Sequence, residues 1–425
     1  MHVVVIGGGW SGVAAAMYAA GRGACVTVLE SRSYLGGRAR SFVDRHTGTE
    51  IDNGQHVLIG AYTSMLDMIS ALGTEHVLQP QPALKVPFVD VSGRRTVLNA
   101  GRLPGTLGMA WGIATLGGLS WSSKRGILRW ALQLQLGRLQ AGEETCLQHL
   151  QRMGQTPQAI ERFWEPIILA TLNAPLHLAD AQLLLAVMRL GFLGGTDAAR
   201  ILLPTTGLSW LLEPFPAWLE QRNGTVRLST MVERLEADDH IVQAVWCSNG
   251  ERIEADAVVI ATPAASVQRI LPEAKVPSFV NSPIISVYLW YNQSWLADDM
   301  VATLGTTIQW VFRKPSPGVV SLTISAASAL ASRSSEEIIT QCDAELRQLF
   351  GLATDVYLHH GQVIKEKQAT PLFLPTERAA RCHQVPGVPR NVAVAGDWTD
   401  TGLPATLEGA VRSGRRAAAA VIAAE

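Results

Sequence analysis

The hydrophobic pattern along the chain predicts buried strands that alternate with helices. Residues 2–6 are mostly apolar and β-branched, residues 14–20 have the composition of a helix, and residues 25–29 form a second apolar run. Such runs, joined through a helix, are typical of parallel strands covered on both faces. Residues 257–263 and 391–397 form two more runs of this kind. The pattern therefore predicts an α/β fold whose sheet draws strands from distant parts of the chain.

The middle of the chain has a different pattern. Residues 81–204 show helical apolar spacing, and one such row is Leu128, Leu132, Leu136 and Leu139. A further helix is expected over 209–222. Strands are expected over 225–228 and 232–236, and a hairpin over 241–246 and 251–254 around Asn249-Gly250. Residues 276–366 alternate short strands with one helix at 334–350, which predicts the sheet of a second domain.

Composition narrows the class of protein. The chain has 425 residues, of which 48% are hydrophobic, so it can bury a substantial core in two or three domains. A formal net charge of −1 gives no support for nucleic-acid binding. The five cysteines are scattered without a CxxC pair, which indicates neither a metal site nor a disulfide framework. With the first strand starting at residue 2, we expect no signal peptide and a cytoplasmic location.

One long segment has an unusual charge pattern. No acidic residue lies between Asp90 and Glu143, and residues 103–123 carry no charge at all. Glycine is too frequent there for a spanning helix. The segment is flanked by the basic residues Arg94, Arg95, Arg102, Lys124, Arg125, Arg129 and Arg138. An apolar surface with basic flanks suits an anionic membrane interface, so we expect residues 91–142 to face a membrane. The alternative is a core helix pair whose arginines are simply solvated.

A glycine-rich turn follows the first strand and has the spacing Gly7-x-Gly9-x-x-Gly12. Glycines at this spacing let the backbone approach a pyrophosphate, whose charge is met by amides at the helix start, Ser11 among them. The second strand ends on Glu30, at the distance expected of an acid that binds an adenosine ribose. Because Glu30 would repel a ribose phosphate, the unit favours FAD or NAD over NADP.

Two further signals favour FAD. The run Gly36-Gly37-Arg38 is an extension typical of flavoproteins, in which the arginine reaches the pyrophosphate. Near the other end of the chain, a strand runs into Gly396-Asp397 and a helix begins at about Leu407. Asp397 is then placed to contact the ribityl or phosphate region, while amides near Leu407 face the flavin ring. A simple turn at Gly396-Asp397 is the alternative.

Together these motifs resemble the FAD-dependent amine oxidase and phytoene desaturase superfamily over nearly the whole chain. Within it the chain is most similar to the hydroxysqualene dehydroxylase family. This narrower resemblance rests on Gly9-Trp10-Ser11-Gly12, on Asp52-Asn53-Gly54-Gln55-His56, and on Trp164-Glu165-Pro166 with Leu172-Asn173-Ala174-Pro175.

The resemblance implies an α/β architecture in which a Rossmann-type FAD-binding domain is interleaved with a mixed-sheet and helical substrate domain. We assign residues 1–80, 205–265 and 385–425 to the FAD-binding domain, and residues 81–204 and 266–384 to the substrate domain. The substrate domain is expected to hold an apolar tunnel that opens toward a membrane, which agrees with the charge pattern of residues 91–142.

The resemblance also implies roles for single residues. Gly54 and Gln55 are expected near the flavin ring, and the backbone of Val232 at the adenine. Asp52 and His56 are the first candidates for an acid, although Asp52 could instead hold loop amides and His56 bond the backbone. Tyr62 is a further candidate acid. Lys365 and Lys367 lie near a predicted strand, but no pattern assigns either to the flavin.

The implied reaction is the reductive removal of a hydroxyl group from hydroxysqualene to give squalene. In chemical terms, an acid protonates the departing oxygen, and reduced flavin delivers hydride from N5 to the allylic cation. A dry tunnel keeps water from recapturing that cation. The chain has no second glycine fingerprint, so we expect no dedicated NAD(P)H domain, and the electron donor is unidentified.

Three alternatives remain. A carotenoid-type desaturase would use the same cofactor and a similar tunnel in the opposite redox direction. An amine oxidase needs an acidic or aromatic cage for its substrate, which the sequence does not indicate. A prenyl-lipid carrier of the Rab escort and GDP-dissociation-inhibitor type would bind lipid without flavin chemistry, but FAD motifs at both ends of the chain argue against it.

Overall fold

A parallel sheet gathers strands from both ends and the middle of the chain. The computed structural model describes residues 1–423 apart from 102, 104, 239 and 383. The strand order is β10-β2-β1-β14-β20, and Val3, Val4 and Val5 have no exposed surface because both faces of the sheet are covered. The strands are β1 (His2–Ile6), β2 (Cys25–Leu29), β10 (Thr225–Arg227), β14 (Ala257–Ile260) and β20 (Val392–Val394).

Helices and a small antiparallel sheet cover the two faces of this parallel sheet. On one side a shared core holds α1 (Trp10–Ala20), α2 (Thr63–Leu72), α10 (Phe215–Glu220) and α13 (Leu407–Ala423). On the other side lie α11 (Ala264–Ile270) and the sheet β11 (Val232–Asp238), β12 (Ile241–Cys247) and β13 (Arg252–Glu254). The predicted hairpin is confirmed, with β12 and β13 antiparallel.

Two predicted helices differ from the structure. Helix α1 begins at Trp10, directly after Gly9, and not at residue 14. The helix expected over 209–222 is broken into η4 (Leu208–Leu211) and α10. Pro214 and Pro216 explain the break, because proline has no amide to donate and its ring clashes with the preceding turn.

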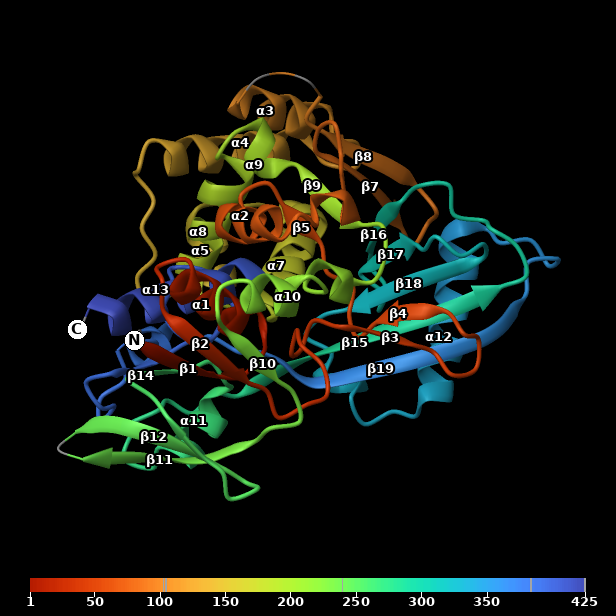
Figure 1. Cartoon of the computed structure of the whole chain (residues 1–425). Helices are drawn as coiled ribbons and strands as arrows, with labels where there is room; N and C mark the ends of the chain where they lie inside the picture. The colour runs from red at the N-terminus through yellow and green to blue at the C-terminus, as the bar shows by residue number, and fades with distance from the viewer. Residues whose placement is uncertain (102, 104, 239, 383, 424–425) are drawn as a thin grey trace.

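A larger mixed sheet forms the right-hand side of Figure 1. Its order is β19-β15-β18-β17-β16-β7-β8. Helix α12 (Ser335–Phe350), close to its predicted bounds, packs on one face through a separate core. The strands are β7 (Lys85–Asp90), β8 (Arg95–Asn99), β15 (Asn281–Tyr291), β16 (Met300–Leu304), β17 (Trp310–Arg313), β18 (Val319–Ile324) and β19 (Leu358–Pro371).

A helical region lies above the parallel sheet in Figure 1, to the left of β7 and β8, and packs on the other face of the seven-stranded sheet. It contains α3 (Thr106–Thr115), α4 (Trp121–Gln135), α5 (Cys146–Arg152), α6 (Pro157–Ala159), α7 (Glu165–Leu172), α8 (Ala181–Val187) and α9 (Thr196–Ala199). Two π-helical turns, η2 (Ile160–Trp164) and η3 (Met188–Phe192), adjoin α7 and α8.

The leucine row predicted around residues 128–139 is only partly a buried stripe. Leu132 and Leu136 are 56% and 53% exposed, and Leu139 is buried but lies beyond the end of α4. Helix α4 instead buries Ile127, Trp130 and Leu134. The apolar spacing was read correctly as helical, but it marks the outer face of the helix.

Short strands and turns connect these parts. The hairpin of β3 (Ser41–Val43) and β4 (Glu50–Asp52) leads into the segment 53–57, and β9 (Ile201–Pro204) pairs with β5 (Leu58–Ile59) and β6 (Leu78–Pro80). The remaining short turns are η1 (Glu75–Val77), η5 (Ser328–Leu330) and η6 (Pro375–Ala380).

Candidate functional site

The three fingerprint glycines have different structural roles. Gly7 has φ +106°, and a Cβ on it would lie 2.5 Å from the carbonyl oxygen of Ala261. A Cβ on Gly12 would lie 1.9 Å from the oxygen of Gly7. Gly9 differs, because its φ of −74° suits any residue and a Cβ there would meet nothing within 4 Å. Gly7 and Gly12 therefore close the turn, while Gly9 leaves room for a ligand to approach the backbone.

The start of α1 has the features of an anion site. Gly9 is its N-cap, no side chain caps it, and its first turn holds no acidic residue. The first intrahelical bond runs from the amide of Val13 to the oxygen of Gly9, so the amides of Trp10, Ser11 and Gly12 have no partner within the helix. Donors at a helix N-terminus attract a phosphate group. These residues fit the pyrophosphate of a dinucleotide.

Glu30 is held beside the glycine turn. The amide of Gly8 donates to Oε2 at 2.6 Å, and the amide of Arg32 donates to Oε1 at 2.8 Å. A carboxylate has about four acceptor positions, so Glu30 keeps capacity for a ribose hydroxyl. The side chain is 9% exposed and fixed in place before any ligand binds.

Arg38 and Asp397 come together from opposite ends of the chain. Arg38 Nη2 donates to Asp397 Oδ1 at 2.6 Å, and Nη1 donates to the carbonyl of Ala369 at 2.9 Å. The negative charge of Asp397 raises the pKa of the Arg38 guanidinium. The sequence indicated both residues as flavin contacts, and the structure adds that each holds the other.

The second half of the predicted site lies at the start of α13. Gly396 donates its amide to Ser413 Oγ at 3.0 Å, which ties the loop after β20 to the helix. Leu407 is the first residue of α13, as predicted. Helix α13 lies against α1, and a Cβ on Gly414 would come within 1.9 Å of the oxygen of Ser11. This contact brings both helices of the site together. Val232 starts β11 as a buried side chain.

Asp52 is tied down by the residues around it. Its Oδ1 accepts from Ser41 Oγ at 2.7 Å and from the amide of Leu208 at 2.9 Å. The hydroxyl of Tyr288 accepts from the Asp52 amide and donates to the Asp52 carbonyl, both at 3.1 Å. Burial raises the pKa of Tyr288, so the phenol keeps its proton. These contacts correspond to the structural alternative for Asp52.

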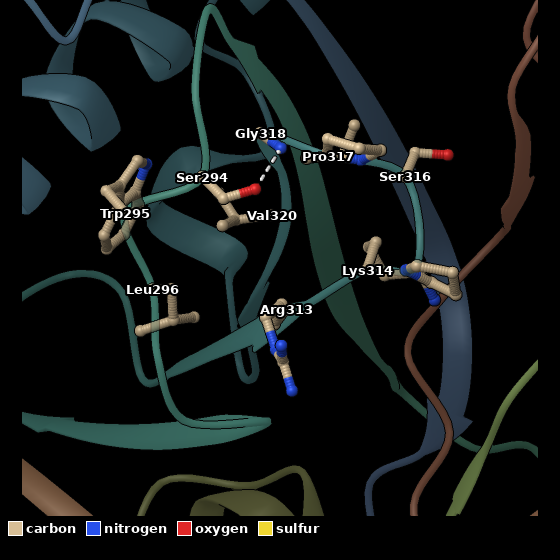
Figure 2. A pocket seen from close by; sticks show the side chains of 11 residues that line it. Ser294, Trp295, Leu296, Arg313, Lys314, Ser316, Pro317, Gly318 and Val320 are labelled. Carbon is tan, nitrogen blue, oxygen red and sulfur yellow. Dashed lines mark hydrogen bonds between the residues drawn. The ribbon is translucent and has the colours of Figure 1, made fainter.

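Lys314 contacts the same segment and was missed by the sequence reasoning. Its Nζ lies 3.7 Å from Asp52 Oδ2 and donates to Gln55 Oε1 at 3.3 Å. Lys314 follows β17 and lines a surface pocket with Ser294 and Arg313, and Figure 2 shows its side chain turned away from that of Arg313. The turn around Lys314 has no motif, so no sequence signal pointed to it.

His56 is half-buried and faces Gly54. Burial lowers the pKa of His56, the Asp52 carboxylate opposes that shift, and Arg38 adds to it. The ring is therefore mostly neutral at pH 7. A methyl group on Gly54 would lie 3.8 Å from His56 Nε2 and 3.7 Å from Ser286 Oγ. The histidine and a serine of β15 therefore both lie beside Gly54.

The other candidates have separate positions. Tyr62 precedes α2, contacts Thr406 at the start of α13, and has its pKa raised to about 12 by burial. Lys365 lies on β19 and donates to the carbonyls of Ala331 and Arg333. Those contacts turn Lys365 away from the segment 52–56. Lys367 is exposed on the same strand.

A buried carboxylate that carries no motif supports this region. Glu408 is 1% exposed, accepts from the amides of Ser64 and Met65 at the start of α2, and pairs with Arg412. It joins α2 to α13. Within the described ranges, no group of three or more His, Cys, Asp or Glu residues is arranged to hold a metal ion.

Comparisons with known proteins agree with this geometry. The model of the family described as flavin containing amine oxidoreductase matches residues 10–422. The chain belongs to this family. It is an FAD-dependent oxidoreductase, and the residues around Gly9 fit that cofactor.

Two solved structures of oxidases share the fold of this chain. A putrescine oxidase is 18% identical with a TM-score of 0.74, covering 100% of this chain and 99% of the other. The cyclohexylamine oxidase of Brevibacterium oxydans is 18% identical with a TM-score of 0.71, covering 99% and 98%.

Curated relatives narrow the family further. The hydroxysqualene dehydroxylase of Sinorhizobium fredii is 32% identical over 98% of this chain and 97% of its own length. That of Rhodopseudomonas palustris is 32% identical over 99% and 98%. A 15-cis-phytoene desaturase of Glycine max is 23% identical over 99% of this chain and 79% of its own length. Within the flavin-containing family, the chain therefore belongs with the hydroxysqualene dehydroxylases.

Proposed function

We propose that this enzyme removes the hydroxyl group of hydroxysqualene reductively to give squalene. The observation that carries the proposal is the 32% identity to hydroxysqualene dehydroxylases over 98% of the chain, against 23% to a phytoene desaturase. The bound FAD, once reduced, supplies the hydride. The residues of the chain bind the cofactor, hold the substrate and supply the proton that the leaving oxygen needs.

The cofactor contacts follow from the geometry above. We propose that the N-terminus of α1 and Arg38 bind the pyrophosphate, that Glu30 binds the adenosine ribose, and that the backbone of Val232 meets the adenine. The flavin end lies by Asp397, the start of α13 and Gly54 with Gln55. The parallel sheet and the helices on it then form the FAD-binding domain, over residues 1–80, 205–265 and 385–425.

We propose His56 as the proton donor and Asp52 as a positioning residue. His56 is the titratable side chain next to Gly54, and a lowered pKa makes its protonated form a stronger acid. Asp52 has hydrogen-bond partners on Oδ1 and a nearby lysine at Oδ2, so its role is to fix the segment that carries His56.

We also propose that the enzyme collects its substrate at a membrane surface. Leu107, Trp111 and Trp121 are 64%, 56% and 76% exposed on α3 and α4, and Leu132 of α4 and Leu136 directly after it are also exposed. Arg125 and Arg129 are exposed on α4, while Arg102 lies outside the described residues. An apolar face with cations binds an anionic bilayer. No helix in the described part of the chain is long and apolar enough to span a membrane.

The deciding experiment mixes chemically reduced holoenzyme with hydroxysqualene in detergent under anaerobic conditions. Flavin reoxidation with stoichiometric squalene supports the proposal. If the flavin stays reduced while oxidised enzyme turns over a polyene such as phytoene, the desaturase alternative replaces it. A purified protein that folds but retains no flavin would favour the carrier alternative.

A further inference from the structure

Three polar side chains form a line across the seven-stranded sheet, on the face that packs against the helical region. Ser286 of β15 is paired with Thr323 of β18, and Thr323 is paired with Trp310 of β17. Directly paired residues of neighbouring strands point to the same face of a sheet and lie side by side. We call these three residues the polar strip.

The polar atoms of the strip have no partner. Ser286 Oγ, Thr323 Oγ1 and Trp310 Nε1 are all buried and make no hydrogen bond within the described part of the protein. Ser286 as a whole is 1% exposed. Most buried polar groups are paired, and an unpaired one costs free energy. Three such groups in one line indicate that the strip is built to meet a polar group of a ligand.

The strip begins at the proposed reaction site. Ser286 Oγ and His56 Nε2 both lie near Gly54, at 3.7 Å and 3.8 Å from the position that a Cβ on Gly54 would take. Two residues along β15, Tyr288 holds the backbone of Asp52, which confirms that this face of the strand looks toward the segment 52–56. The proton donor proposed above and the unpaired serine therefore lie on the same side of Gly54, close to each other.

Away from that point the same line of residues becomes apolar. Trp310 is paired with Ala302 of β16, and Ala302 with Phe88 of β7. Ala302 and Phe88 belong to the large core shared with the helical region. The face therefore has one polar end at His56 and one apolar end, which matches a long hydrocarbon that carries a single polar group.

We propose that the polar strip binds the hydroxyl group of the substrate and then holds the water that leaves. This inference rests on the proposed function. It makes the polar strip the part of the enzyme that selects a substrate with a hydroxyl group. The C–O bond breaks, the oxygen takes one proton and departs as water, and hydride from the reduced flavin forms the new C–H bond. Serine and threonine hydroxyls donate and accept, and the indole N–H donates, so the strip can follow the oxygen through this change.

The test compares two ligands on the oxidised holoenzyme, which has no hydride to give. The dissociation constants of hydroxysqualene and squalene are measured in detergent from the change in the flavin spectrum. Wild type is expected to prefer hydroxysqualene about ten-fold, the worth of one or two buried hydrogen bonds. Ser286→Ala and Thr323→Val are expected to remove most of this preference while leaving squalene affinity within about two-fold, since a hydrocarbon gains nothing from the lost hydroxyls.

Two controls sharpen the result. Thr323→Ser keeps the hydroxyl and should restore the preference lost in Thr323→Val. Ser321→Ala removes another buried serine from the same face of β18. Its Oγ also makes no hydrogen bond within the described residues, but its neighbours on the adjoining strands are Phe312 and Tyr288 and not members of the strip. It should keep the preference. Should Ser286→Ala fail to fold, the threonine pair carries the test alone.

The outcomes separate the two proposals. An unchanged preference in Ser286→Ala and Thr323→Val overturns the strip, as does an equal effect of Ser321→Ala. If reduced wild type still converts hydroxysqualene in that case, the proposed function stands without the strip. If reduced wild type makes no squalene from hydroxysqualene, both proposals are overturned.

Discussion

Arg38 and Asp397 are 359 residues apart in sequence and share a hydrogen bond of 2.6 Å. The contact joins the extension after β2 to the loop after β20, so the two halves of the proposed flavin site fix each other. A guanidinium that is already oriented by a carboxylate and a carbonyl loses little conformational freedom when it meets a phosphate.

Removal of this carboxylate is expected to weaken FAD binding. Asp397→Asn leaves Arg38 without its charged partner, and we expect about ten-fold weaker FAD binding, consistent with the loss of one hydrogen bond between charged groups. The measurement is titration of apoprotein with FAD. Asp400→Asn is the matched control, because Asp400 is exposed and its side chain bonds only the amide of Gly402 within the described residues. Equal losses in both variants would argue against the role given to Asp397.

A substitution in the glycine turn is expected to separate the effect on folding from the effect on FAD binding. Gly9→Val is expected to fold normally and to lose FAD, because a Cβ at this position meets no protein atom within 4 Å while the side chain fills the approach to the helix amides. Gly142→Val, on an exposed glycine with equally open surroundings, should keep both. Circular dichroism and flavin content are the measurements. Normal FAD occupancy in Gly9→Val would contradict the site assignment.

The pKa of His56 makes a prediction about rate and pH. Because burial holds this pKa below its ordinary value of 6.5, the acid form is scarce at pH 7 and increases as the pH falls. The rate of flavin reoxidation by hydroxysqualene should therefore rise as the pH falls through the pKa of His56. His56→Gln should slow this rate about 100-fold and remove the dependence, since a general acid contributes at least about that factor. FAD content serves as the control, and a wild-type rate that ignores pH would exclude His56 as the donor.

The buried ring of His149 is expected to lower the free energy of unfolding in acid. Its ring has no exposed surface, Trp130 Nε1 donates to its Nε2 at 3.2 Å, and burial lowers its pKa. The unfolded chain takes up the proton first, at about pH 6.5. Stability is therefore full above that pH and falls as the pH drops toward the lower pKa of the folded state. Urea unfolding at pH 7 and pH 5 should show a smaller difference in His149→Gln than in wild type.

The apolar surface on α3 predicts binding to vesicles. The double variant Leu107→Gln, Trp111→Gln should lower affinity for anionic vesicles at least ten-fold, because each side chain contributes about 1 kcal/mol or more when it enters the interface. Val280→Gln changes a residue that is 66% exposed just before β15, outside α3 and α4, and should have little effect. Vesicle sedimentation measures this. If the double variant binds as well as wild type, the membrane proposal fails.

Much of the proposed FAD-binding domain could be predicted from the sequence, because the motifs that indicate it are short and local. The unit of β1, α1 and β2 follows from a glycine turn between two apolar runs, and its strand bounds are confirmed at 2–6 and 25–29. Arg38 and Asp397 were each identified by a short motif. Their pairing was not, since no local pattern reports which distant residue a side chain meets.

The substrate half was less predictable for a physical reason. The serine at position 286 and the threonine at 323 are isolated polar positions in mostly apolar runs, and such positions carry no motif. Ser286 and Thr323 become neighbours only through the register in which β15 pairs with β18, and the sequence alone does not give that register. Likewise, the spacing of Leu132 and Leu136 defines a helical stripe but not what covers it, and here the stripe is exposed.

The close contact between α1 and α13 has a consequence for biosynthesis. The glycine fingerprint is made before β14, which pairs with β1, and before β20, which pairs with β14. Gly414 meets Ser11 only once α13 has been made. Until then α1 lacks its contact with α13, and the loop of Asp397 lacks its anchor at Ser413. We therefore expect FAD to be incorporated after α13 has been made, and a chain stalled before residue 407 to leave the ribosome without it.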